Sequence, residues 1–276
     1  MGLRINTNVP SISAQRNLGI QRDWQDRSMQ KLASGERITR ASDDAAGLAI
    51  SEKLKAEIRS TRQAARNTND GISVIQTAEG GLNEISNILV RLRELSIQSA
   101  SDTVGETERG FSDLEVQHLK QEVSRIAETT KFNGLYLLNG QDNDLEFQVG
   151  TGSSPEKDRM VYKSATADSR AESMGIQELS VTTKEGAQQN LDKIDGAIMK
   201  VSGNRASLGA LQNRLQSTVN NLMVTDENLS AANSRIRDAD IASESAELAR
   251  RNILTAAGTA VLAQANSSGA MALKLL

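Results

Sequence analysis

The sequence predicts a mainly α-helical protein: both ends of the chain form a long antiparallel helical coiled-coil bundle, with a small β-hairpin element in the middle. Three observations support this fold class. Proline, which breaks helices, occurs only at Pro10 and Pro155 in 276 residues, against a usual share of roughly 5 %. Apolar residues recur every seven positions in the C-terminal half. Turn dipeptides cluster in one central segment. Because aromatic residues make up only 2 % of the chain, aliphatic and small side chains have to fill the core.

The seven-residue repeat is the strongest of these signals. A strict repeat of this kind keeps apolar side chains on one face only if helices supercoil around each other. A lone helix has nothing to bury such a face against, so the repeat requires partner helices. It consists of seven residues: Ile194, Val201, Leu208, Leu215, Leu222, Leu229 and Ile236.

The partner helices lie upstream in the chain. One runs from about Leu54 to Leu95 with similar apolar spacing, interrupted by a slip near Gly80-Gly81, and Ser42-Asp43-Asp44 marks its beginning by supplying capping oxygens. A second, shorter helix places either Leu114 or Val116 on its apolar face, followed by Leu119, Val123 and Ile126. Two upstream helices and one downstream helix predict a slender antiparallel bundle.

The central segment, residues 132–164, has short apolar runs separated by turn signals. Asn133-Gly134 and Asn139-Gly140 favour tight turns. The runs Leu135–Leu138, Leu145–Val149 and Met160–Lys163 are typical of short strands. We expect a small antiparallel element within the bundle; a cluster of surface loops is the alternative.

The two ends of the chain differ from the bundle. The C-terminal helix combines an alanine stripe with a second apolar line, which indicates neighbours on two sides, and the N-terminal helix is only weakly amphipathic. Neither end offers enough apolar surface to offset its ordering entropy. We therefore expect both ends to fold fully only against other copies of the chain. The expected polymerisation residues are Ile241, Leu248, Ile253, Ala256, Ala260, Val261, Leu262, Leu273 and Leu276.

Composition excludes several function classes. The chain has no cysteine and one histidine, so thiolate metal sites, two-histidine metal motifs and thiol catalysis are absent. A net charge of −3 gives no reason to expect nucleic acid. No apolar run approaches a membrane span, and residues 1–17 are too polar for a cleavable secretory signal. We expect no cofactor, no metal and no enzymatic activity.

Four residues or short motifs could indicate a metal site or a ligand-binding site, but in each case a purely structural role is favoured. His118 has no second ligand nearby and is expected at the surface. Asp142-Asn143-Asp144 lacks the spacing of a calcium loop, and Gly150-Thr151-Gly152 lacks the third glycine of a dinucleotide loop, so both are expected to be turns. Trp24 is expected to pack against a neighbour.

Four blocks of the sequence, in order, resemble the bacterial flagellin family. They are RITRASDDAAGLAISEKLKAEIR (Arg37–Arg59), NTNDGISVIQTAEGGLNEISNILVRLRELSIQSAS (Asn67–Ser101), KFNGLYLLNG (Lys131–Gly140) and LARRNILTAAGTAVLAQAN (Leu248–Asn266). The chain resembles a short form of the family that lacks large outer domains.

The resemblance implies a self-assembling structural subunit of the flagellar filament, exported unfolded through the flagellar type III apparatus and folded on polymerisation for swimming motility. It implies an inner core of residues 1–46 with 236–276, and an outer tube of residues 47–235. The implied partners are other copies of the chain, filament cap and hook–filament junction proteins, and an export chaperone; the implied location is the extracellular filament. A junction protein or a cytosolic coiled-coil scaffold remains as an alternative.

The resemblance also implies a recognition site for Toll-like receptor 5 on the free subunit. The matching positions are Arg91, Leu95, Gln98 and Glu115. The alternative is that Arg91, Arg93, Glu94 and Gln98 only form the solvated face of a bundle helix.

Overall fold

The computed structural model describes residues 7–141 and 144–274, with side chains as far as residue 267. The chain divides into two compact units: a terminal unit, Met1–Ile58 with Glu227–Leu276, and a bundle unit, Arg59–Asp226. The predicted mainly α class is confirmed. The elements in order are α1 (Val9–Ser34), α2 (Ala45–Ser99), α3 (Glu106–Thr129), β1 (Lys131–Phe132), β2 (Leu135–Tyr136), β3 (Leu145–Gln148), α4 (Pro155–Asp158), β4 (Arg159–Tyr162), the 3₁₀ helix η1 (Ser164–Ala167), α5 (Lys184–Arg237) and α6 (Ile241–Lys274).

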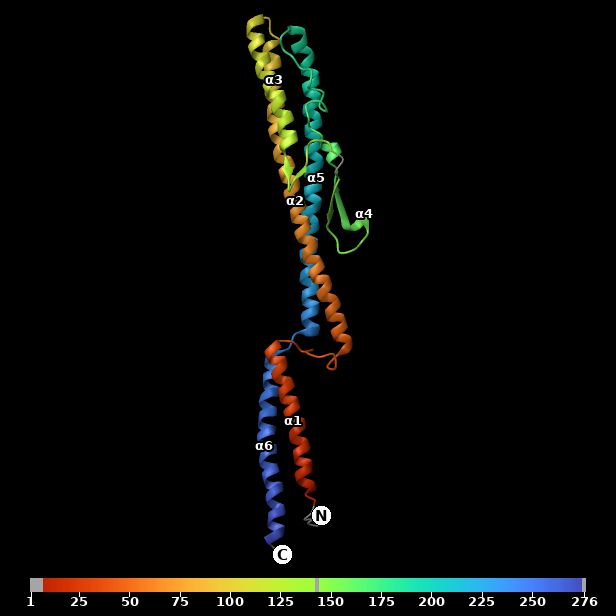
Figure 1. Ribbon diagram of the computed structural model, residues 1–276, viewed down its shortest axis with the longest axis vertical. Helices are drawn as coiled ribbons and strands as arrows, with labels where there is room; N and C mark the ends of the chain where they lie inside the picture. The colour runs from red at the N-terminus through yellow and green to blue at the C-terminus, as the bar shows by residue number, and fades with distance from the viewer. Residues whose placement is uncertain (1–6, 142–143, 275–276) are drawn as a thin grey trace. The chain divides into compact units, whose positions relative to one another are not determined.

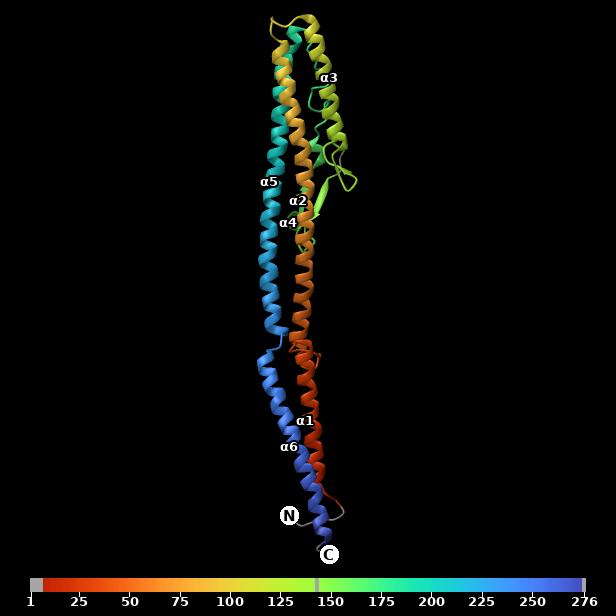
Figure 2. The ribbon, with the colours of Figure 1, turned by 90° about the vertical axis from the view of Figure 1, so that its left-hand side faces the viewer.

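The bundle unit is built from α2, α3 and α5, which lie side by side in both views (Figures 1 and 2). One continuous hydrophobic core runs between them. The predicted heptad seam is confirmed within this unit: its first four members are fully buried and Leu222 is half-buried. On α3 the structure decides between the two candidates, because Val116 is buried whereas Leu114 is 60 % exposed.

The slip at Gly80-Gly81 does not interrupt α2, which is helical throughout. It marks the place where other chain segments approach the helix. A Cβ atom at Gly81 would lie 2.8 Å from both Leu138 Cδ1 and Thr130 Oγ1, whereas Gly80 faces open space. Leu138 enters the core immediately after β2, so the missing side chain at Gly81 makes room for the incoming β segment.

The central β element consists of two separate two-stranded antiparallel sheets, β1–β2 and β3–β4. The first is closed by Asn133 and Gly134, both with positive φ, as expected for the predicted Asn-Gly turn. Strand β2 stops at Tyr136, two residues short of the prediction, because Leu137 and Leu138 leave the ladder and insert fully buried side chains into the bundle core.

The second sheet pairs Leu145 with Tyr162 and Gln148 with Arg159. Asp158 closes its loop: its backbone carbonyl accepts hydrogen bonds from the amides of Val149 and Gly150, and its carboxylate accepts from Gly152 and Ser154. The Gly150-Thr151-Gly152 motif is thus part of a structural turn. Asp142 and Asn143 lie outside the described residues.

In the terminal unit, α1 and α6 run antiparallel to each other (Figure 2). The connecting segments that follow α1 and precede α6 also meet: the Arg37 amide donates to the Arg237 carbonyl at 2.6 Å, and the Ala239 amide donates to the Gly35 carbonyl at 2.9 Å. Helix α2 begins where the capping residues predict, because the Gly47 amide donates to Asp44 Oδ1 at 2.8 Å.

Candidate assembly and recognition surfaces

The interface between α1 and α6 is largely polar. Its cross-helix hydrogen bonds join amides, hydroxyls and one guanidinium: Asn8 to the Ala265 carbonyl (2.9 Å), Ser11 to Asn266 (2.7 Å), Arg251 to Gln21 (3.0 Å), Gln25 to Asn252 (2.8 Å) and Thr255 to Gln25 (3.4 Å). Leu18 is the one α1 side chain among the described residues that is both apolar and buried. The buried apolar area between these helices is therefore small.

Most of the large apolar side chains of the same helices are exposed to solvent in the single chain. More than two fifths of each of these side chains is exposed to solvent. This pattern is the reverse of a self-sufficient helical hairpin, which buries its apolar stripe against its partner. The exposed residues are Val9, Ile12, Ile20, Trp24 and Met29 on α1, and Ile241, Ile253, Leu254 and Val261 on α6.

The residues expected to form the polymerisation core lie on both faces of α6. Ile241, Ile253, Ala256, Ala260 and Val261 are exposed, and Ile253 is 70 % exposed. The described side chains that turn partly toward α1 are Leu248 and Leu262. The side chain of Leu273, and Leu276 as a whole, lie outside the described residues.

A shallow groove of about 270 Å³ runs between α1 and α6. Gly258 allows the helices to approach here, since a Cβ at this position would lie 3.3 Å from Leu18 Cδ1. Leu254 and Val261 also line the groove, so it is continuous with the exposed apolar residues of α6.

Trp24 lies half-exposed on α1, with the Arg251 guanidinium stacked 4.5 Å from its ring centroid. Its packing partner within the chain is thus a cation on α6, a contact that sequence spacing did not predict. The exposed half of the ring remains uncovered in the single chain.

Residues 89–99 of α2 present a charged surface toward α3. Arg91 Nε donates to Glu115 Oε1 at 2.9 Å and Arg91 Nη1 donates to Glu94 Oε2 at 3.1 Å. These hydrogen bonds raise the pKa of Arg91 above its ordinary value. The structure thus brings two of the four predicted receptor-contact residues, Arg91 and Glu115, together on an exposed face.

The other two predicted contact residues separate. Gln98 is exposed on α2, whereas the Leu95 side chain is only 2 % exposed and belongs to the bundle core. Leu95 therefore packs in the bundle core and is not part of the exposed surface. The same two helices expose Leu114 and three apolar side chains for which the sequence predicted no role: Val90, Ile97 and Phe111.

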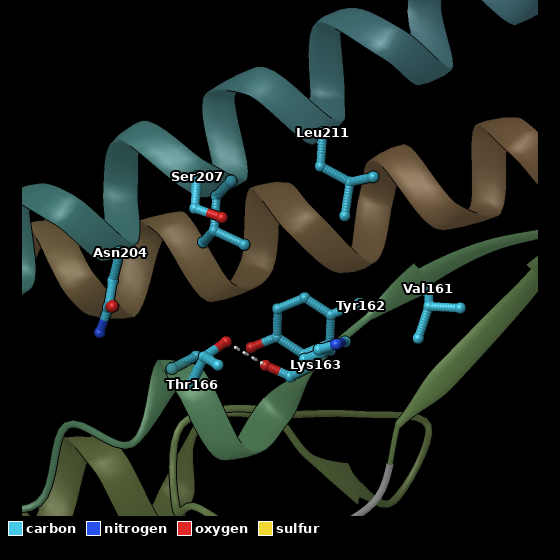
Figure 3. Close-up of a pocket in the computed structure, with 9 residues that line it drawn as sticks. Val161, Tyr162, Lys163, Thr166, Asn204, Ser207 and Leu211 are labelled. Atoms are coloured by element: carbon cyan, nitrogen blue, oxygen red, sulfur yellow. Dashed lines mark hydrogen bonds between the residues drawn. The ribbon is translucent and has the colours of Figure 1, made fainter.

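A second groove, of about 320 Å³, lies where β4 and η1 meet α5 (Figure 3). Tyr162 forms part of its wall, and its buried hydroxyl donates to the Leu137 carbonyl at 2.5 Å. Burial raises the pKa of the Tyr162 hydroxyl. Helix α5 contributes Asn204, Ser207 and Leu211 to the groove. On η1, Thr166 Oγ1 donates to the Lys163 carbonyl at 2.9 Å.

His118 is exposed, as expected for a surface residue. Across the described ranges, no group of three or more potential metal ligands is close enough to hold an ion. Within those same ranges, no helix combines the length and hydropathy needed to cross a membrane.

Long paired helices with apolar side chains turned outward define a class of structural proteins that complete their packing by self-association. The chain matches the descriptions "Bacterial flagellin N-terminal helical region" over residues 5–143 and "Bacterial flagellin C-terminal helical region" over residues 191–276. It is 46 % identical to a flagellin of Halalkalibacterium halodurans over 272 residues, covering 99 % of each chain. The chain belongs to the bacterial flagellin family.

Two further comparisons agree with this assignment. A flagellar filament core protein of Brachyspira hyodysenteriae is 40 % identical over 286 residues, which covers 99 % of each chain. The crystal structure of Bacillus cereus flagellin is 32 % identical, with a TM-score of 0.51, and the match covers 61 % of this chain and 94 % of that one. As a flagellin the chain is a structural filament subunit and not an enzyme.

Proposed function

We propose that this subunit polymerises through its terminal helices, that folding of these helices is coupled to assembly, and that the resulting filament serves swimming motility. The observation that carries the proposal is the distribution of buried apolar side chains. Among the described residues of the terminal unit, only Leu18, Ile38 and Ile58 are both apolar and buried, whereas nine large apolar side chains on α1 and α6 are exposed.

The shortage of buried apolar side chains favours coupled folding. Ordering a helix costs backbone conformational entropy, and helices in proteins offset this cost mainly by packing an apolar face. Among the described residues of α1 and α6, Leu18 is the one large apolar side chain that is buried in the single chain. Neighbouring copies that cover the exposed apolar side chains would add apolar burial, which joins folding and polymerisation into one step. Contacts between copies that do not close into a ring generate a helical polymer.

Deleting residues 257–276 tests this proposal. The truncated subunit should keep a helical bundle by circular dichroism, because the bundle core lies outside the deletion, but it should form no filaments when seeds are added. The matched control is the full chain under the same conditions, observed by electron microscopy. Normal filament growth from the truncated subunit would contradict the proposal.

We also propose that the subunit is exported unfolded through the flagellar type III apparatus, assisted by an export chaperone, and is added outside the cell beneath the filament cap and beyond the hook–filament junction. Family membership supports these steps. In a strain with an inactive export apparatus, the subunit should accumulate inside the cell and disappear from sheared surface filaments.

The composition of sheared wild-type filaments separates the alternative protein classes. A filament subunit would be the dominant band, a junction protein would be a trace component, and a cytosolic scaffold would be missing.

Recognition of the free subunit by Toll-like receptor 5 remains a proposal, supported by the exposed arrangement of Arg91, Glu115 and Gln98 and by the family resemblance. Arg91→Ala should weaken receptor activation by monomer at least about fivefold, as loss of an interface arginine commonly does. Arg93→Ala is the control, because Arg93 is turned to Asp195 on α5 (2.6 Å). An unchanged response of Arg91→Ala in a reporter-cell assay would count against the site.

A further inference from the structure

The α1–α6 pair has a heptad seam made mostly of polar and small residues. On α1, the positions turned toward α6 recur at alternating intervals of three and four: Ser11, Ala14, Leu18, Gln21, Gln25, Ser28 and Leu32. The corresponding positions on α6 are Leu248, Arg251, Thr255, Gly258, Leu262 and Ala265. Small side chains at a seam allow close approach but discriminate poorly between registers, because sliding by a heptad places one small residue where another was. Something other than apolar packing has to set the register.

Arg251 makes the most specific set of contacts in this seam. Its Nη1 donates to Gln21 Oε1 at 3.0 Å, its guanidinium stacks on Trp24 at 4.5 Å, and its Nη2 pairs with Glu247 Oε1 at 2.5 Å. Gln21 and Trp24 are three residues apart on α1 and so lie one turn from each other on the face toward Arg251. One side chain of α6 thereby recognises two consecutive turns of α1.

The preceding residue provides an internal comparison. Arg250 carries the same charge and also pairs with Glu247, at 3.2 Å. However, its side chain is 70 % exposed, whereas that of Arg251 is 17 % exposed. The two arginines differ in position on the helix and not in chemistry, so the contrast between them isolates the contacts with α1.

A slip of one heptad would remove the partners of Arg251. It would place the guanidinium beside Ala14 and Asn17 in one direction, or beside Ser28 and the cationic Lys31 in the other. Neither alternative offers an aromatic ring, and the second brings two positive charges together. A partly buried cation without its partners costs free energy that small seam residues cannot recover.

We propose that Arg251 is the positioning residue that sets the register of α6 against α1 as the terminal helices fold in the polymer. The inference rests on the proposed coupled assembly and adds to it a residue that determines helix register. Apolar contacts between copies drive assembly. Within each copy, the contacts of Arg251 with Gln21 and Trp24 select one alignment of the two helices. A single polar residue at a seam position sets register in coiled coils by the same physical mechanism.

The absence of cysteine from the chain allows a direct measurement of register. Ser11→Cys with Asn266→Cys joins two positions whose side chains are in contact at 2.7 Å. Ser11→Cys with Thr259→Cys reports a slip of one heptad, because Thr259 lies about 10 Å away along α6. Filaments are grown from full-length subunits carrying each pair, oxidised, dissolved in denaturant, and analysed for the intramolecular disulfide.

In the otherwise wild-type background, the Ser11/Asn266 pair should dominate. Arg251→Ala should lower its yield at least about fivefold relative to Arg250→Ala, the matched control, with a rise in the Ser11/Thr259 product. The exchange Gln21→Arg with Arg251→Gln keeps the hydrogen-bonded pair across the helices and should restore the original pattern. If Arg251 acted only through the general stability of the helices, this exchange would not restore the cross-linking pattern.

Unchanged cross-linking in Arg251→Ala filaments would overturn the inference. If Arg251→Ala forms no filaments, recovery of filaments and of the Ser11/Asn266 product by the exchange variant supports it, and lack of recovery overturns it. Failure of the wild-type subunit to polymerise would instead refute the proposed function, so the two failures are distinguishable.

Discussion

Two adjacent glycines in α2 show how much a single residue depends on its surroundings. An alanine at either position should favour the helix by up to about 1 kcal/mol over glycine. At Gly80 the new methyl group meets open space. At Gly81 it meets the buried Leu138 and the branched Thr130, whose hydroxyl is already bonded to the Ile126 carbonyl at 2.7 Å.

We therefore predict that Gly80→Ala stabilises the bundle by about 0.5–1 kcal/mol, whereas Gly81→Ala destabilises it by about 1–2 kcal/mol through overpacking. Urea unfolding of the monomer, followed by circular dichroism, measures both. Equal stabilities of the two variants would show that Leu138 and Thr130 move aside freely.

The two tyrosines of the chain form a second contrasting pair. Tyr162 is buried, and burial raises the pKa of its hydroxyl, so its folded-state pKa exceeds its unfolded-state pKa. The folded protein then holds the proton more tightly than the unfolded chain. This contribution to stability is complete below about pH 10, the ordinary tyrosine pKa, and is lost as pH rises beyond it.

Above about pH 10, the free energy of unfolding should fall by up to about 1.4 kcal/mol per pH unit from Tyr162 alone. Tyr162→Phe should flatten this alkaline decline. It should also lower stability near neutral pH by about 1–2 kcal/mol, because the Leu137 carbonyl loses its donor. Tyr136→Phe, at an exposed position, is the matched control for removal of a tyrosine hydroxyl near neutral pH. Urea unfolding across an alkaline pH series measures all three, and identical slopes would contradict the prediction.

At the scale of elements, Arg237 connects the end of α5 to two other segments of the terminal unit. Its Nε pairs with Glu36 Oε1 at 2.9 Å, and its Nη1 pairs with Glu52. Hydrogen bonds with both carboxylates raise the pKa of Arg237. Its side chain is mostly buried, so the pairs are better shielded from solvent than an ordinary surface ion pair.

Arg237→Gln should loosen the connecting segments that follow α1 and precede α6. In filaments, hydrogen exchange of the Arg37 and Ala239 amides should quicken about tenfold, because these amides pair across the two segments. Arg235→Gln, at an exposed position on the same helix, should leave the exchange unchanged. Similar protection in both variants would mean that the backbone pairing holds without the ion pairs.

At the scale of the whole molecule, the two units differ in what stabilises them. The hydrophobic core cluster extends from Val74 to Leu215 and lies entirely within the bundle unit. That unit is also one uninterrupted stretch of chain, Arg59–Asp226. The terminal unit, by contrast, is made from both chain ends and buries few apolar residues of its own.

The bundle unit expressed alone should therefore fold and unfold cooperatively. Its thermal midpoint by circular dichroism should agree within a few degrees with that of the full-length monomer, because the terminal helices add little to the stability of a single copy. An unfolded fragment, or one that melts far below the full chain, would show that the ends stabilise the bundle before assembly.

The sequence by itself determined the helical class, the heptad seam of α5, the start of α2 and the Asn-Gly turn after β1. Each of these follows from contacts within a few turns or from the period of one helix, and such local constraints are visible in the residue order. The outward exposure of large apolar residues on α6 could also be anticipated from its two apolar lines.

Only the tertiary structure decided which residues meet across long separations in the chain. It chose Val116 over Leu114, buried Leu95, directed Leu137 and Leu138 into the core and brought Arg251 to Gln21 and Trp24. Arg250 and Arg251 are adjacent residues of the same type. Which of them is buried depends on the face that α6 turns toward α1. That choice depends on the packing of two helices about 230 residues apart in sequence, and no local pattern encodes it.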